Sequence, residues 1–245
     1  MRQEGCMLRK RLQALSQILK ITMLGVIVFS IVFALNHLNL SDYFPIKTVR
    51  VYGLNRVNQQ EVQDVLYPMV EKGFFTINVD GIRNRLLQMP WVSDLYVRRI
   101  WPDQVIITLT EKKPIALWNE TVLLSESGEL FIPEQETYPS HLPKFTGPTG
   151  QQLFMLQYFK DINRLLLSLH VKISSLELTP FLTWKLTLDN GITLQVGYED
   201  ILARLNQFVK VYPKIVGDRA NDVDCVDLRY PNGVAVRWKK MASNQ

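Results

Sequence analysis

The segment Val92–Glu111, VSDLYVRRIWPDQVIITLTE, decides the fold of the first half of this 245-residue chain. Its first part, up to Ile100, has the composition of a β-strand, and Trp101-Pro102-Asp103 is typical of a turn. The second part alternates apolar residues with polar or exposed ones, and the apolar positions are Val105, Ile107 and Leu109. The segment therefore predicts a β-hairpin with one buried face.

A third strand and a helix are predicted before this hairpin. Val49 and Val51 alternate with polar residues, as in a half-buried strand that ends at Gly53. Asn58 is a suitable helix N-cap, and Glu61 places an acidic residue in the first turn. Apolar residues then recur at helical spacing and form one stripe, which comprises Val62, Val65, Leu66, Met69 and Val70.

A second helix is predicted to begin near Asp80 and to carry Ile82, Leu86 and Met89 on one face. Pro90 closes this helix, because proline disfavours helical geometry in the residue before it. The predicted order of elements in the first domain is therefore strand, helix, helix, strand, strand.

Residues 21–40 carry no formal charge, and their densest apolar part runs from Ile21 to Leu35. The hydrocarbon core of a bilayer, ~30 Å thick, needs about 20 mostly apolar residues in a helix. The basic residues that precede this segment are Arg2, Arg9, Lys10, Arg11 and Lys20. Since positive flanks stay in the cytoplasm, we predict one transmembrane helix with a cytoplasmic N-terminal tail and all later residues outside.

A cleavable signal peptide is the competing interpretation of this segment, because it also has a basic head and an apolar middle. The apolar run is long for a signal peptide, and the exit from Ala34 to Ser41 lacks a small-residue cleavage site. A buried helix of a soluble protein is disfavoured because the run is apolar all round.

The charge of the chain argues against nucleic acid as a partner. The chain has 28 basic and 23 acidic residues, a net charge of +5, but its first twenty residues alone carry about +4. A nucleic-acid-binding protein would concentrate its basic residues on the folded part. The two cysteines, Cys6 and Cys225, lie on opposite sides of the predicted membrane segment and cannot pair, and Cys225 is expected to be a small buried strand residue.

The second domain, residues 114–240, is predicted to be β-rich with two helices. The expected strands are Ile115–Trp118, Val122–Leu124, Leu130–Ile132, Val171–Leu178, Thr183–Leu188 and Ile192–Val196. Apolar stripes predict helices around Leu153–Leu169 and Ile201–Val209, and Leu142–Pro148 is expected to be a connector. Val223–Tyr230 and Val234–Trp238 are expected to form a final hairpin around Pro231-Asn232-Gly233.

No catalytic or metal-binding set is apparent in the sequence. The histidines His37, His141 and His170 are isolated and lack metal-ligand spacing. Asp222, Asp224 and Asp227 are close together, but the glycine and glutamate of a calcium loop are missing. No nucleophile elbow or phosphate-binding glycine loop is present, so we predict a non-enzymatic protein without a cofactor or metal.

Three phrases in this order resemble the FtsQ/DivIB family of bacterial cell division proteins: Leu87–Val105 (LQMPWVSDLYVRRIWPDQV), Glu111–Asn119 (EKKPIALWN) and Val226–Trp238 (VDLRYPNGVAVRW). The first domain resembles a polypeptide-transport-associated (POTRA) domain. The resemblance covers essentially the whole chain. It implies an α+β fold with a cytoplasmic tail (1–20), a transmembrane helix (21–40), a POTRA domain (41–113), a β-rich domain (114–240) and a C-terminal tail (241–245).

The resemblance also implies a function: a divisome scaffold in the cell inner membrane at the division septum, with periplasmic domains that link early and late division proteins. The implied partners are FtsB and FtsL, without nucleic acid or a small-molecule substrate. In the family, FtsB binds by adding a strand to the last strand of the protein, so that backbone groups supply affinity and alternate side chains supply specificity.

The family pattern for this binding site is matched in part. The matching residues are Arg229, Tyr230, Gly233, Val236 and Trp238, and Arg204 aligns with a helix arginine that pairs with an acidic residue of the partner. Asn232 and Val234 depart from the smaller residues that are common there, although Val234 remains a candidate contact. From the residues alone, the aromatics are equally consistent with ordinary strand positions, and the arginines with solvated surface charges.

The alternative function is a POTRA-type receptor for unfolded polypeptide in a transport or assembly pathway. A second candidate surface is a basic patch of Arg98, Arg99, Lys112 and Lys113, which is also consistent with solvated strand edges.

Overall fold

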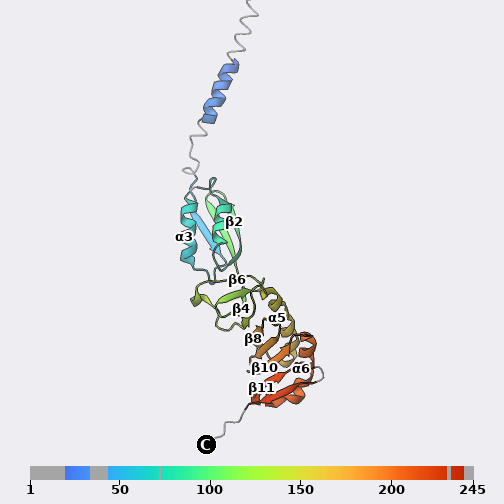
Figure 1. Ribbon diagram of the computed structural model, residues 1–245. Helices are drawn as coiled ribbons and strands as arrows, with labels where there is room; N and C mark the ends of the chain where they lie inside the picture. Colours follow the sequence, from blue (N-terminus) through green and yellow to red (C-terminus); the bar gives the residue numbers. More distant parts are fainter. Residues whose placement is uncertain (1–19, 34–43, 72, 231–232, 240–245) are drawn as a thin grey trace, which may run out of the picture. The chain divides into compact units, whose positions relative to one another are not determined.

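The computed structural model describes residues 20–33, 44–71, 73–230 and 233–239. The chain divides into two compact units (Figure 1). Unit 1 comprises Met1–Tyr52, Gln59–Leu86 and Leu95–Thr108, and unit 2 comprises Gly53–Asn58, Leu87–Asp94 and Leu109–Gln245. Each unit is considered by itself below.

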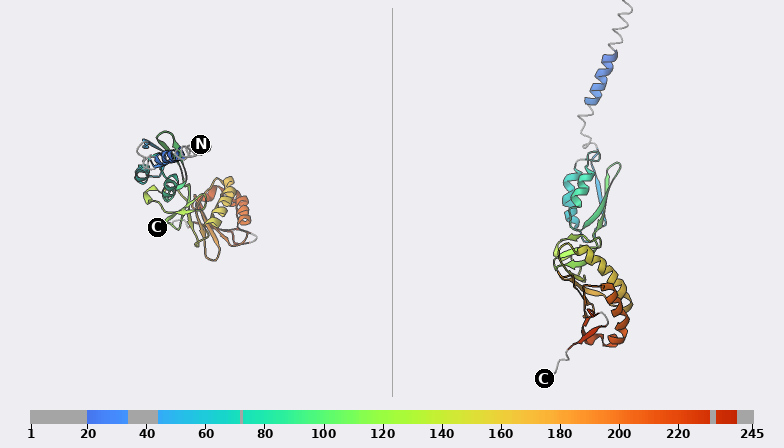
Figure 2. Two further views of the ribbon diagram at one scale, coloured as in Figure 1. Left: turned by 90° about the horizontal axis from the view of Figure 1, so that it is seen from above. Right: turned by 45° about the vertical axis from the view of Figure 1, so that its right-hand side comes forward.

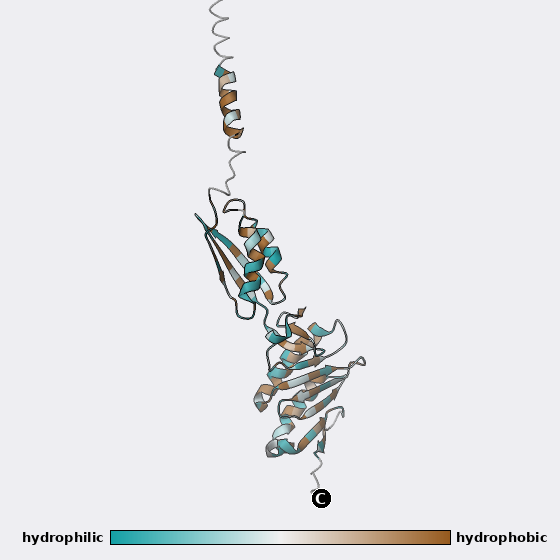
Figure 3. Cartoon of the chain, turned by 90° about the vertical axis from the view of Figure 1, so that its left-hand side faces the viewer, coloured by the Kyte–Doolittle hydropathy of each residue, from teal (hydrophilic) through white to brown (hydrophobic). Residues whose placement is uncertain are grey.

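Residues 20–33 form a helix whose side chains are exposed and mostly hydrophobic (Figure 3). Among the described residues, no helix combines the length and the apolar character needed to cross a membrane. Residues 34–40 of the predicted transmembrane segment lie outside the described residues, as do Cys6 and the C-terminal tail.

The first domain has the predicted order of elements. These are β1 (Thr48–Tyr52), α3 (Gln59–Val70), α4 (Val79–Leu86), β2 (Val92–Ile100) and β3 (Gln104–Glu111). The strands form a sheet in the order β1-β3-β2, in which β1 runs parallel to β3 (Figure 1). Both helices cover one face of this sheet (Figure 2).

The alternation in the opening hairpin has the predicted effect on burial. Val105 and Ile107 are fully buried, and Leu109 is nearly so, whereas Thr108 and Thr110 between and after them are exposed. The second helix is shorter than predicted. It ends at Leu86, and Met89 instead accepts a hydrogen bond from the Val92 N–H, which closes a turn around Pro90.

A second sheet lies in unit 2, and nine strands in the described part of the chain form it in the order β12-β11-β10-β9-β8-β7-β4-β5-β6. The strands are β4 (Pro114–Trp118), β5 (Val122–Ser125), β6 (Leu130–Phe131), β7 (Lys144–Thr146), β8 (Ile173–Leu178), β9 (Trp184–Leu188), β10 (Thr193–Gly197), β11 (Val223–Asp227) and β12 (Ala235–Trp238). The predicted strands are confirmed with small shifts of their ends.

One strand was missed in the predicted connector. Lys144–Thr146 forms β7, which pairs in parallel with β4 on one side and with β8 on the other. Its central residue, Phe145, is fully buried. A three-residue strand between prolines and a glycine is too short to show a period of two, so its apolar pattern gave no signal.

The two predicted helices are present, and they cover one face of the second sheet. They are α5 (Gln152–Leu166) and α6 (Ile201–Ile215), which lie side by side (Figure 2). Short 3₁₀ turns flank them at Leu167–Leu169 (η2) and Gly217–Asp222 (η3), and a third, η1, spans Gln135–Thr137. The helix α6 connects β10 to β11, which are parallel and therefore need such a crossover.

Candidate functional site

The strand β12 lies at one end of the second sheet. It pairs with β11 in antiparallel register, in which Val226 faces Val236 and Asp227 faces Ala235. No strand in the described part of the chain pairs with the other edge of β12. We call this edge, with the backbone of Ala235–Trp238, the outer edge. Because no described strand covers the outer edge, its backbone N–H and C=O groups are open to pairing with another chain.

The direction of the backbone groups on β12 follows from one hydrogen bond. The N–H of Lys239 donates to the carbonyl of Asp222 at 2.7 Å, so Lys239 faces the β11 side. Successive residues of a strand point their backbone groups to opposite sides. Alternation therefore directs Ala235 and Arg237 toward β11, and Val236 and Trp238 toward the outer edge.

Both aromatic residues predicted for the site are exposed. Tyr230 is 56% exposed and Trp238 is 40% exposed. The Trp238 ring is nevertheless held in place, because the guanidinium of Arg219 in η3 lies 4.5 Å from its centroid. Such a cation–π contact orders an aromatic surface without removing it from solvent. Sequence reasoning missed Arg219, because η3 is short and the contact is not local.

The smaller residues of the predicted site have different surroundings. Val234 and Val236 are partly buried and pack against the core of unit 2. A Cβ built at Gly233 would meet no atom within 4 Å, and the φ angle of Gly233 lies outside the left-handed range. The described part of the chain therefore gives no steric reason for glycine at this position.

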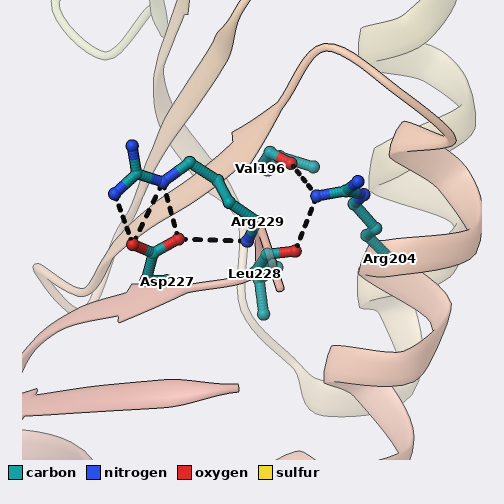
Figure 4. A network of polar contacts seen from close by, with 5 residues as sticks. All are labelled: Val196, Arg204, Asp227, Leu228 and Arg229. Atoms are coloured by element: carbon teal, nitrogen blue, oxygen red, sulfur yellow. Dashed lines mark hydrogen bonds and ion pairs between the residues drawn. The ribbon is translucent and has the colours of Figure 1, made fainter. Parts of the chain in front are cut away.

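Arg229 follows β11 by two residues and is paired with Asp227, the last residue of that strand (Figure 4). Its Nη2 donates to Asp227 Oδ2 at 2.6 Å, and its Nε lies 2.9 and 3.0 Å from the two carboxylate oxygens. These hydrogen bonds lower the pKa of Asp227, although burial of the carboxyl acts in the opposite direction. They also raise the pKa of Arg229. The ion pair fixes the guanidinium beside the end of β11.

Arg204 is not the solvated helix charge that the sequence alone allowed, since its side chain is only 18% exposed. From α6 its Nη1 donates to two carbonyls, that of Leu228 at 3.1 Å and that of Val196 at 3.3 Å (Figure 4). A more distant ion pair joins Nη2 to Glu199 at 3.9 Å. Arg204 thus ties α6 to the ends of two neighbouring strands.

The two predicted arginines meet at Gly197. A Cβ there would lie 3.4 Å from Cγ of Arg229 and 3.5 Å from Nη1 of Arg204. Gly197 also has a φ of +88° at an irregularity in the pairing of β10 with β9, so glycine is favoured there for its backbone as well. The structure thus brings Arg204 and Arg229 to one place, on either side of a glycine that the sequence gave no reason to select.

A second ion pair joins the last two strands. Nε of Arg237 donates to Oδ2 of Asp224 at 2.7 Å. Asp224 lies where β11 has one residue more than β12 in the register between Val223 and Cys225. Asp224 and Asp227, for which the sequence showed no partner, are thus each paired with an arginine. Cys225 beside them is buried, as predicted, and burial raises the pKa of its thiol.

The basic patch suggested for the first domain lacks one of its members. Lys112 has a side chain only 10% exposed, and its Nζ lies 2.7 Å from a carboxylate oxygen of Glu129. The same ammonium lies 5.2 Å from the centre of the Phe131 ring. Arg98, Arg99 and Lys113 are exposed. Lys112 is therefore part of the packing of unit 2.

Comparison with known proteins places this chain in a family. Residues 44–112 match the POTRA domain of FtsQ type, and residues 116–229 match the C-terminal region of the cell division proteins FtsQ/DivIB. The cell division protein FtsQ of Coxiella burnetii is 34% identical over 220 residues, which are 89% of this chain and 90% of that protein. The chain belongs to the FtsQ/DivIB family.

Other relatives support the same assignment. The FtsQ proteins of Shewanella oneidensis and Vibrio cholerae are each 34% identical to this chain, over 216 and 193 residues. These alignments cover 88% and 78% of this chain, and 82% and 74% of the respective relatives. Family membership confirms the predicted POTRA domain and cell division role, and it confirms that the protein is not an enzyme.

The match to the C-terminal family region ends at residue 229, before β12. The roles of Tyr230, Gly233, Val234, Val236 and Trp238 therefore stay predictions.

Proposed function

We propose that this protein is a divisome scaffold that binds FtsB, and through it FtsL, by strand addition at the outer edge of β12. The observation that carries the proposal is the position of β12 at the end of its sheet, with no described strand on its other side. An extended segment of FtsB would continue the sheet there, as peptides do at exposed sheet edges.

Backbone groups would supply the main contacts. Val236 and Trp238, which alternation directs to the outer edge, offer the N–H and C=O groups that an added strand needs. The open space at Gly233 would let the partner backbone approach closely. The glycine would then serve the complex, since the described fold does not require it.

Side chains would supply specificity. Tyr230, in the loop after β11, and Trp238, the last residue of β12, are exposed aromatic residues, and aromatic residues are frequent binding hot spots. Arg229 uses its Nε and Nη2 for Asp227, which leaves Nη1 as a donor for an acidic residue of the partner. Arg204 is mostly committed to strand carbonyls, so its contribution would be to position β10 and β11, with a partner carboxylate as a further acceptor.

The proposal includes the membrane anchor. Residues 21–40 would form a single spanning helix in the inner membrane, of which the described helix 20–33 is the first part. The basic residues before it would keep the N-terminal tail in the cytoplasm and place both domains in the periplasm. The protein would thereby present the outer edge of β12 at the division septum.

A single proline substitution in β12 tests strand addition. Val236→Pro removes an N–H that points to the outer edge and leaves the hydrogen bonds to β11 in place, as is typical of proline in edge strands. Val236→Ala is the matched control, because it shortens the same side chain and keeps the N–H. The full chain in nanodiscs would be tested for capture of a soluble FtsB–FtsL fragment.

We expect Val236→Pro to abolish capture and Val236→Ala to retain most of it. Hydrogen exchange of β11 would verify that the β11–β12 pairing survives in both variants. Equal capture by the two variants, with β11 still protected, would contradict strand addition at this edge.

A further inference from the structure

We propose that one end of the folded part of unit 1, formed by the sheet β1-β3-β2 and its two helices, docks on the lipid surface of the membrane that holds residues 21–40. This inference rests on the membrane anchor of the proposed function. The docking surface consists of the exposed aromatic side chains Phe44, Phe75 and Trp101, which we call the aromatic tip. Their exposed fractions are 36%, 47% and 69%.

Two members of the aromatic tip are held together by direct contacts. The N–H of Phe74 donates to the carbonyl of Phe44 at 2.8 Å. The rings of Phe44 and Phe75 are 5.1 Å apart at an angle of 88°, an edge-to-face arrangement. The loop between α3 and α4 is therefore fixed against the residues that lead into β1.

The third member, Trp101, lies at the same end of unit 1. The parallel register of β1 and β3 begins with Thr48 opposite Gln104, directly after the hairpin turn that contains Trp101. The N–H of Lys47 donates to the carbonyl of Asp103 at 2.9 Å, and Nζ of Lys47 lies 3.5 Å from the Asp103 carboxylate. The start of β1 and the tip of the β2–β3 hairpin thus lie next to each other (Figure 1).

The length of the chain restricts what can cover this end. Only residues 41–43 separate Leu40, the end of the predicted membrane segment, from Phe44. At ~3.3–3.6 Å per residue, Phe44 lies within roughly 14 Å of the end of that segment, however unit 1 is turned. The interfacial region of a bilayer extends several ångströms beyond the hydrocarbon core, so Phe44 is tethered at or near it.

The chemistry of the aromatic tip suits that environment. Tryptophan and other aromatic side chains are favoured at the boundary between lipid and water, where one side is apolar and the other wet. Arg98 and Arg99 are exposed on β2 next to the turn and add positive charge that would attract anionic headgroups. Docking by the aromatic tip would restrict the orientation of unit 1 toward the membrane.

Quenching of tryptophan fluorescence by lipids tests this inference. The full chain would be placed in nanodiscs of phosphatidylethanolamine and phosphatidylglycerol, with and without a nitroxide near the top of the acyl chain. Trp101→Phe identifies the signal of Trp101 and keeps an aromatic ring in the tip. We expect the parent to show a quenched component that is lost in Trp101→Phe, and equal quenching of the two proteins would overturn the proposal.

A second set of variants tests whether Phe44 and Phe75 help to hold Trp101 against the lipid. Phe44→Asp with Phe75→Asp should move Trp101 away from the lipid and reduce its quenching. Phe181→Asp is the matched control, because Phe181 is 87% exposed on a turn of unit 2 and should leave the quenching unchanged. Loss of quenching in the control as well would contradict a specific role of the tip. If the double variant unfolds by circular dichroism, the Trp101→Phe comparison decides alone.

Extraction with alkaline carbonate separates this inference from the proposed function. A chain that is released from the membrane would refute the anchor, and with it the docking. A chain that stays in the membrane without quenching of Trp101 would refute the docking alone. Capture of the FtsB–FtsL fragment should be the same for the parent and the Phe44 and Phe75 double variant.

Discussion

Replacing Arg204 by alanine tests whether this arginine is part of the support of the last strands. The Arg204→Ala change removes the donor that Leu228 and Val196 share for their carbonyls, at 3.1 and 3.3 Å. A buried acceptor that loses its partner costs about 1–3 kcal/mol. The Arg204 side chain is 18% exposed, so in the alanine variant water can bond to the two carbonyls and offset part of this cost.

We therefore expect local opening of β10 and β11 to become easier by ~2–3 kcal/mol in Arg204→Ala, from the two carbonyls together. Arg204→Lys should recover about half of this, because a single ammonium group cannot reproduce the two-pronged geometry of a guanidinium. A surface charge without such contacts would change stability by no more than about 0.5 kcal/mol.

Hydrogen exchange measured by mass spectrometry is the suitable assay, because a chain with two units does not unfold as one two-state system. Peptides that cover β10, α6 and β11 would report the local free energy of opening. The matched control is Arg164→Ala on α5, since Arg164 is 75% exposed and its ion pair with Asp161 is of the weak surface kind. If Arg204→Ala alters protection no more than Arg164→Ala does, the assigned supporting role is wrong.

Three further predictions concern the same end of unit 2. Tyr230→Ala and Trp238→Ala should each weaken capture of an FtsB fragment by ~2 kcal/mol, measured by calorimetry, with unchanged circular dichroism; unchanged affinity in both would reject the hot-spot assignment. The lowered pKa of Asp227 means that its contribution to stability is present above the pKa of the unfolded carboxyl and is lost as pH falls through the lowered folded value. The local free energy of opening of β11, measured by hydrogen exchange at matched pH values, should therefore fall less with acid in Asp227→Asn than in the parent, and an equal fall in both would contradict this. Cys225 should resist alkylation by iodoacetamide until urea is added, as followed by mass spectrometry of its peptide, because burial raises its pKa and excludes the reagent; rapid labelling of the native protein would show that β11 opens freely.

The fold was largely predictable because its longer elements carry strong periodic signals. The alternation in Gln104–Glu111 and the helical stripe of Gln59–Val70 both specify a buried face, and the structure places them accordingly. The end of α4 and the strand β7 were not predictable in the same way. The strand β7 depends on pairing with β4 and β8 over three residues, and α4 ends in a local turn closed by one hydrogen bond; neither leaves a repeat in the sequence.

The candidate site shows where sequence reasoning stops. The terminal position of β12 agrees with the family resemblance, because strand addition needs a strand with a free edge, whereas the exposure of Tyr230 could not be deduced from its residue type. The partners of Arg204 could not be predicted from the sequence. It donates to backbone carbonyls, and since every residue has a carbonyl, residue types do not reveal which ones it reaches. The stacking of Arg219 on Trp238 was equally hidden, since it depends on how η3 folds back.

The parallel pairing of β1 with β3 has a mechanical consequence. The first domain begins with the start of β1 and closes with the end of β3, and the two strands are direct neighbours in the sheet. Tension between the residues before Thr48 and those after Glu111 would therefore slide β1 along β3. In that shear geometry the hydrogen bonds from Thr48–Gln104 to Tyr52–Thr108 share the load, so they must break together instead of one after another.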